Sequence, residues 1–130
     1  MIGRREYFEL PELLDRRLIG KIDSGAHTTS LHATQISHFE KDGEDWVSFL
    51  SVGNQRCEAP VARLKGVRSS NGQVSERIFI RTRLKTLDGK KRQTLVTLAD
   101  RSKMACPMLI GRRYLRHFLI DCGEKFLLGD

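Results

Sequence analysis

Three Asn-Gly or Asp-Gly pairs in the middle of the chain constrain its fold more than any other feature. Asp42-Gly43, Asn71-Gly72 and Asp88-Gly89 each separate two segments rich in β-branched and aromatic residues, among them DWVSFLSV, RIFIRTRL and TLVTLA. These pairs suit the positive φ angles of tight hairpin turns, and the flanking residue types favour strands over helices. The sequence therefore predicts a run of antiparallel strands joined by short turns.

Signals for other elements are few. Residues 11–15 indicate a turn, and residues 112–117, which follow Gly111, indicate a short helix. A fourth hairpin is expected at residues 122–124, where Cys-Gly-Glu divides FLID from KFLLG. Because no repeat or linker interrupts the chain, residues 1–130 are expected to form one all-β domain, a small closed or half-closed antiparallel barrel with one short C-terminal helix.

The composition is typical of a soluble globular protein, with 39% hydrophobic and 30% charged residues. No apolar stretch approaches the ~20 residues that a membrane helix needs. The opening residues, MIGRREYFELPELL, lack the apolar core of a secretory signal. The three cysteines are widely spaced, which favours reduced thiols and a cytoplasmic location over a disulfide framework.

The net charge of +7 favours an anionic partner such as nucleic acid, an acidic peptide or a phosphorylated ligand. Arg81, Arg83 and Lys85 alternate along one predicted strand and would share a face with Phe79, as a nucleic-acid surface would require. The other basic residues are scattered, which is more typical of a solvated surface. We therefore interpret this segment as a half-buried strand with a basic outer side, and expect neither a nucleic-acid nor a membrane partner.

Histidines in the first third of the chain raise the question of a metal site. His27, His32 and His38 lie close in the sequence, with Cys57 beyond them. Zinc takes about four nitrogen, sulfur or oxygen ligands in a tetrahedral arrangement. The spacing of His27 and His32, five residues apart, fits one face of neither a strand nor a helix. A zinc-dependent protease that uses these two residues is an alternative, and no metal ligand is assigned.

In the segment KIDSGAHTTSLHA, residues 21–33, an acidic residue directly follows an apolar run and precedes residues too small to cover it. Asp23 follows LIGKI and precedes Ser24, Gly25 and Ala26. Asp, Ser and Gly form turns for ordinary backbone reasons, so a turn is one explanation. A catalytic carboxylate that is left exposed is the other.

A second segment, MLIGRRYL at residues 108–115, complements the first. Ile22-Asp23-Ser24-Gly25-Ala26 and Leu109-Ile110-Gly111-Arg112 resemble the catalytic loop of retropepsins and the strand that passes behind it. Retropepsins are single-domain aspartic proteases that act as homodimers. The blocks LPEL, KIDSGAHTTSLHA, TLADRSKMACPMLIGRRYL and FLID…KFLLG extend the resemblance over nearly the whole chain. They are similar to a bacterial retropepsin-like family once described as ATP-dependent zinc proteases, whose members accompany RimK-type ATP-grasp ligases.

The resemblance implies a retropepsin-type barrel of about six to eight strands and assigns roles to residues of this chain. The residues assigned to catalysis are Asp23, Ser24 and Gly25; those assigned to substrate binding are Ala26, His27 and Thr28; those assigned to support of the loop are Leu109, Ile110, Gly111 and Arg112. No cofactor is implied, and residues 62–74 are the candidate lid. In viral enzymes an acid pairs with the arginine that Arg112 matches, whereas this chain has His27 at that position.

The chemistry of aspartic proteases explains why such a chain would act as a homodimer. Two carboxyl groups share one proton, so that one acts as general base towards water while the other polarises the scissile carbonyl. This chain has one Asp-Ser-Gly and therefore half a site. The expected function is an aspartic endopeptidase acting on peptides or proteins, with acidic, glutamate-tailed substrates favoured by the basic charge and by the associated ligases. A non-catalytic basic β-barrel that only binds its partner is the other alternative.

Overall fold

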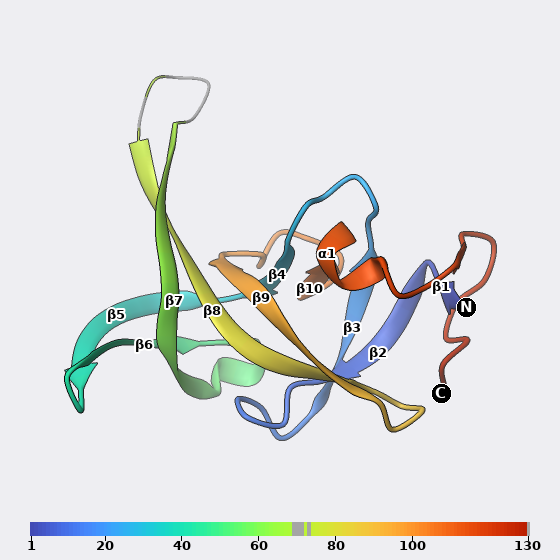
Figure 1. Ribbon diagram of the computed structural model, residues 1–130, viewed down its shortest axis with the longest axis horizontal. Coiled ribbons are helices and arrows are strands. Elements are labelled where there is room, and N and C mark those ends of the chain that lie inside the picture. The colour runs from blue at the N-terminus through green and yellow to red at the C-terminus, as the bar shows by residue number, and fades with distance from the viewer. Residues whose placement is uncertain (69–71, 73, 130) are drawn as a thin grey trace.

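The computed structural model describes residues 1–68, 72 and 74–129 and places most of them in β-strands (Figure 1). One 3-10 turn, Val52–Asn54, and one short helix, α1 (Arg112–Leu115), complete the regular structure of these residues. The strands are β1 (Ile2–Gly3), β2 (Arg5–Glu9), β3 (Arg17–Ile22), β4 (Thr29–His32), β5 (Thr34–Lys41), β6 (Glu44–Leu50), β7 (Arg56–Arg68), β8 (Val74–Thr86), β9 (Lys91–Ala99), β10 (Met108–Ile110) and β11 (Ile120–Asp121).

Six of these strands close a barrel in the order β2-β3-β10-β4-β9-β8, because β8 pairs again with β2. Its interior holds fully buried side chains that include Phe8, Leu31, Ile80, Val96 and Ile110. The expected all-β barrel with one short helix near the C-terminus is thus confirmed. Two pairs, β3–β10 and β4–β9, run parallel, so the barrel is not purely antiparallel. Parallel neighbours need a long connection, and each of these pairs joins segments far apart in the chain.

The hairpins predicted from the turn signals are present. Asp42 and Gly43 have φ of 53° and 78° and connect β5 with β6. Gly89, at φ 90°, lies in the turn between β8 and β9. The Asn71-Gly72 signal lies partly outside the described residues, but β7 and β8 on either side of it pair antiparallel. These two long strands project from the barrel, and β5 and β6 extend beside them (Figure 1).

Strand β8 confirms the interpretation of a half-buried strand with a basic outer side. Thr82, Leu84 and Thr86 are buried, whereas Arg81 and Arg83, which alternate with them, are exposed. Phe79, which was expected on the same face as these arginines, is only 8% exposed, and the Arg63 guanidinium lies 5.7 Å from its ring centre. The aromatic ring is therefore covered by the neighbouring strand β7.

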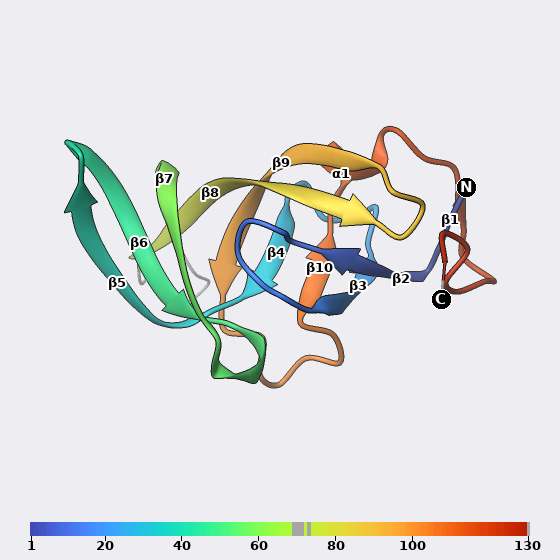
Figure 2. The ribbon, with the colours of Figure 1, turned by 90° about the horizontal axis from the view of Figure 1, so that it is seen from below.

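The prediction of a fourth hairpin at the C-terminal end is wrong. The turn itself forms, with the Gly123 N–H donating to the Asp121 carboxylate at 3.0 Å. The following residues KFLLG form no strand, and β11 instead pairs parallel with β1. Both chain ends therefore lie together at one end of the barrel (Figure 2). None of the helices in the described part of the chain is long and apolar enough to cross a membrane.

A buried carboxylate explains why the C-terminal tail departs from strand pairing. Glu6 is 0% exposed. Its two oxygens accept the N–H groups of Gly3 at 2.7 Å, Leu127 at 2.9 Å and Leu128 at 3.1 Å. The N–H groups of Leu127 and Leu128 are thus used by one side chain, whereas the N–H of Phe126 donates to the Arg5 carbonyl of β2 at 2.9 Å. Glu6 thereby ties both chain ends to β2.

Candidate active site

The Asp23 loop connects β3 with β4, and β10 runs between these two strands. Ile110 lies opposite Ile22 in the parallel pair, and Leu109 lies opposite Ser30 in the antiparallel pair. The N–H of Asp23 donates to the Ile110 carbonyl at 3.0 Å. Two segments that are far apart in the sequence, the acid-containing loop and the strand of LIGR, therefore form one unit.

The Asp23 side chain is half-buried at the start of this loop. One carboxylate oxygen accepts the Gly25 N–H at 2.9 Å, and the Asp23 carbonyl accepts the Ala26 N–H at 3.2 Å. Within the described residues the second carboxylate oxygen has no hydrogen-bond partner. Ser24 and Gly25 beside it are exposed. The carboxylate is thus oriented by its own loop and still accessible from outside.

Gly111 lets the loop and the strand behind it approach closely. A Cβ at this position would lie 2.6 Å from the carbonyl carbon of Thr28 and 2.8 Å from its nitrogen, so any side chain would clash with backbone. The Gly111 N–H donates to the hydroxyl of the buried Thr29 at 3.2 Å. The next two N–H groups, of Arg112 and Arg113, donate to the carbonyls of Ala26 and His27 at 2.8 and 3.2 Å.

The backbone of α1 therefore supports the loop where a side-chain ion pair supports it in viral enzymes. Arg112 and His27 are both exposed, and His27 has no negative charge with which to pair the arginine. The His27 ring instead lies within hydrogen-bond distance of the Thr28 hydroxyl, at 3.2 Å from Nδ1. The structure thus brings together all the site residues assigned from the sequence, in one loop and the segment behind it.

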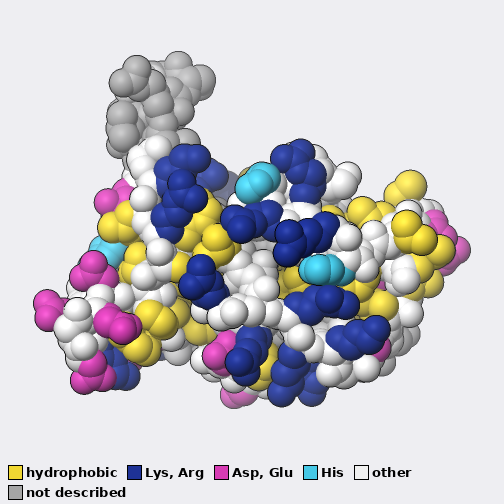
Figure 3. Space-filling model, in the orientation of Figure 1, with side chains coloured by type: hydrophobic (Ala, Val, Ile, Leu, Met, Phe, Trp, Pro, Cys, Tyr) yellow, Lys and Arg dark blue, Asp and Glu magenta, His cyan; other side chains and the backbone are white. Residues whose placement is uncertain are grey.

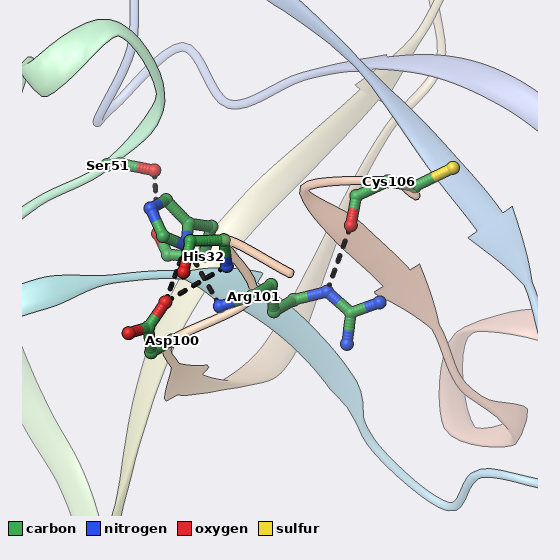
Figure 4. Close-up of polar contacts among 6 residues, drawn as sticks. His32, Ser51, Asp100, Arg101 and Cys106 are labelled. Carbon is green, nitrogen blue, oxygen red and sulfur yellow. Dashed lines mark hydrogen bonds and ion pairs between the residues drawn. The ribbon is translucent and has the colours of Figure 1, made fainter. Parts of the chain in front are cut away.

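The residues considered for zinc do not converge. His27 precedes β4 and His32 ends it, and no group of three ligand-type side chains is found in residues 1–68, 72 and 74–129. Nδ1 of His32 accepts the Arg101 N–H at 3.0 Å and lies 3.9 Å from Asp100 (Figure 4). Burial raises the pKa of the Cys57 thiol to about 11, whereas zinc binds the thiolate. These neighbours give His32 and Cys57 structural roles.

An open hollow of about 290 Å³ lies beside the Asp23 loop, lined by Ser24, Arg112, Leu115, Arg116 and Ile120. The chain ends next to it carry exposed apolar side chains (right side of Figure 3). The exposed fractions are 65% for Met1, 74% for Leu119, 40% for Ile120 and 42% for Leu127.

A second group of residues near the loop was not found from the sequence. Arg113 of α1 and Arg116, which follows α1 as its C-cap, line one pocket with Arg81 of β8. The spacing of Arg113 and Arg116 could have predicted part of this group, since residues three apart share one face of a helical turn. The position of Arg81 beside them has no counterpart in the sequence pattern.

Comparison with known proteins agrees with this geometry. Residues 1–128 match the model of a family described as RimB-like, retropepsin-like aspartic endopeptidase RimB. Proteins of Desulfotalea psychrophila and Shewanella pealeana, each named probable alpha-L-glutamate ligase, are 38% and 35% identical over 138 residues that cover 100% of this chain. The chain spans only 30% of the length of these relatives.

A solved structure shares the fold. The crystal structure of a Legionella pneumophila protein of unknown function superimposes with a TM-score of 0.79 at 25% identity, covering 98% of this chain and 96% of the other. The resemblance inferred from four sequence blocks is therefore confirmed. The chain belongs to the RimB-like family of retropepsin-like aspartic endopeptidases.

Proposed function

We propose that the protein is an aspartic endopeptidase whose active site forms between two copies of the chain, each supplying Asp23. The observation that carries this proposal is the Asp23 carboxylate, held by one N–H of its own loop and otherwise accessible. Two such carboxyls brought together at a two-fold axis share one proton, because both cannot ionise cheaply at short distance. One then activates water, and the other polarises the scissile carbonyl.

The surface beside the loop supports a homodimer. Met1, Leu119, Ile120 and Leu127 expose apolar area at the chain ends, and Ile120 lines the hollow that contains Ser24. Exposed apolar patches of this kind mark interaction sites. A two-fold contact repeats the same patch on both copies, so it would place the two Asp23 loops close to the axis.

The remaining assigned residues have roles that follow from their positions. Ser24, exposed beside Asp23, would bond across the axis or to backbone, and Gly25 leaves room for substrate backbone. Ala26, His27 and Thr28 lead from the acid to β4 and would contact the peptide on either side of the scissile bond. The lid assigned to 62–74 falls on the projecting β7–β8 hairpin; residues 69–71 and 73 of it lie outside the described residues.

Acidic peptides, in particular glutamate-tailed ones, are the proposed substrates. The net charge is +7, and no Lys or Arg in the described residues forms an ion pair with Asp or Glu. Such uncompensated cations favour anionic ligands. Relatives named probable alpha-L-glutamate ligase carry a similar segment, and a ligase of that kind would produce glutamate-containing tails.

Peptide cleavage by the wild type and by Asp23→Asn, each with and without a metal chelator, tests the reaction. Wild type should cleave a glutamate-tailed peptide, Asp23→Asn should lose roughly 10²- to 10⁴-fold in rate, and the chelator should change neither result. Loss of cleavage with chelator but not with Asp23→Asn would establish the zinc alternative. Binding without cleavage, unchanged in Asp23→Ala, would establish the binding module. Preference for neutral peptides would exclude the acidic substrate.

Sedimentation tests the dimer. Leu119→Asp should shift the protein to the monomer and abolish cleavage although Asp23 is intact, because one copy holds half of the site. Ile36→Asp is a matched control, since Ile36 is also exposed, at 37%, but lies on β5. Full activity of a Leu119→Asp monomer would contradict a shared active site.

A further inference from the structure

A small polar pocket lies where α1 meets the outer surface of β8 and β9. Its volume is about 150 Å³. Three arginines line it, one from β8, one from α1 and one that caps α1, together with residues of β9. The lining residues are Arg81, Gln93, Thr94, Leu95, Arg113 and Arg116.

The three arginines have no acidic partner in the part of the chain that the structure describes. All three arginines are exposed. The ion pairs found among the described residues involve His32 and His38 and none of the three arginines. Arg81 also borders a neighbouring hollow that contains Glu12 and Glu58, yet it forms no ion pair with either. Lys and Arg side chains gather on this face of the molecule (Figure 3). Like charges at close range repel one another unless an anion lies between them.

The pocket is attached to the candidate active site without being part of it. The Arg113 N–H donates to the His27 carbonyl at 3.2 Å, so α1 is fixed to the Asp23 loop. Arg116 lines both this pocket and the hollow beside Ser24. An extended substrate that leaves the site along α1 would therefore reach the arginines some distance from the scissile bond.

We propose that Arg81, Arg113 and Arg116 form an exosite that binds a carboxylate of the substrate's acidic tail and so determines specificity. The identity of the ligand rests on the proposed function. Guanidinium groups bind planar oxyanions in a bidentate manner, and the amide of the exposed Gln93 offers a further hydrogen bond. The volume suits one carboxylate or phosphate group rather than a folded segment. Phosphate shares this chemistry, so the test includes it as a separate arm.

Binding is measured with Asp23→Asn protein, in which the peptide stays intact. A fluorescent hexaglutamate peptide should bind, a hexaglutamine peptide should not, and inorganic phosphate should compete only weakly. Arg81→Ala combined with Arg113→Ala, two residues of the pocket that do not line the hollow beside Ser24, should weaken hexaglutamate binding about tenfold or more. The control is Arg83→Ala, which removes one positive charge, where the double variant removes two, from the exposed side of β8 outside the pocket and should change binding less than about twofold. Thermal unfolding confirms that each variant is folded.

Equal weakening by Arg83→Ala and by the double variant would overturn the exosite, because general charge would then explain the binding. Tight phosphate binding without hexaglutamate binding would overturn the carboxylate assignment. In otherwise wild-type protein, the double variant should raise KM for glutamate-tailed substrate, leave kcat unchanged and leave neutral peptides unaffected. Cleavage that requires Asp23 but is unchanged in the double variant would overturn the exosite and leave the proposed peptidase intact. Arginine-dependent binding with no cleavage supports the exosite and contradicts the proposed peptidase.

Discussion

Two carboxylates, those of Glu6 and Asp23, lie next to the same strand and have opposite surroundings. Glu6 pairs with Gly20 of β3 from the neighbouring strand, and Asp23 follows the end of β3. Glu6 is fully buried and accepts three backbone N–H groups, whereas Asp23 is half-buried and accepts one. Buried polar groups must be hydrogen-bonded, so the arrangement at Glu6 is a condition of folding.

This difference distinguishes a carboxylate with a structural role from one that is available for catalysis. A carboxylate whose acceptor sites are used by backbone holds segments together and has no capacity left for a reaction. One with an accessible oxygen contributes little to stability and can take a proton from water. The following predictions test this distinction by measuring stability at positions of each kind.

The largest loss of stability is expected for Glu6→Ala. It leaves the buried N–H group of Gly3 and the part-buried N–H groups of Leu127 and Leu128 without an acceptor, at about 1–3 kcal/mol for each group that water cannot reach. Denaturant unfolding should show a loss of about 3 kcal/mol or more. Glu6→Gln keeps one acceptor oxygen and should lose less; equal stability of Glu6→Ala and wild type would refute the structural role.

Gly111→Ala is expected to cost up to about 3 kcal/mol, because its Cβ would meet Thr28 backbone at 2.6 Å and backbone cannot move away cheaply. The matched variant Gly25→Ala places a Cβ 3.1 Å from a carboxylate oxygen of Asp23, a side chain that can shift. Thermal unfolding should therefore show a much lower Tm for Gly111→Ala than for Gly25→Ala. Similar Tm values would mean that the loop does not need this close approach.

Tyr114 offers a third kind of polar group, buried and without a hydrogen-bond partner for its hydroxyl among the described residues. Burial raises the pKa of Tyr114 to about 12 from its ordinary 10.0. The unfolded chain therefore ionises first, and stability should fall by about 2 kcal/mol as pH rises from 10 to 12. Tyr114→Phe should be as stable as wild type at neutral pH, and its free energy of unfolding should fall less than that of wild type between pH 10 and 12. Identical decline in both proteins would contradict the assignment.

The smallest effect is expected for Asp23→Ala. The side chain is half-buried and has the Gly25 N–H as its partner, so stability should change by less than about 1 kcal/mol. Denaturant unfolding beside Glu6→Ala gives the direct comparison. A loss as large as that of Glu6→Ala would show that Asp23 is also a structural acid.

Features set by neighbouring residues were predictable, and features set by distant ones were not. The Asp42-Gly43 and Asp88-Gly89 turns follow from backbone preferences within a few residues. The tail at 125–129 was expected to form a strand, but the N–H groups of Leu127 and Leu128 donate to Glu6, more than a hundred residues earlier. The meeting of Arg81 with Arg113 and Arg116 in one pocket depends in the same way on segments far apart in the sequence.

The sequence by itself determined the hairpins, the alternation of basic and buried residues along β8, and the two segments that resemble the retropepsin loop and its supporting strand. Only the tertiary structure decided which acid is buried, which strands pair in parallel and which arginines share a pocket. The physical reason is the separation along the chain over which each kind of interaction acts. Turn and strand preferences act within a few residues, whereas burial and hydrogen-bond partners are set by segments that meet only when the barrel closes.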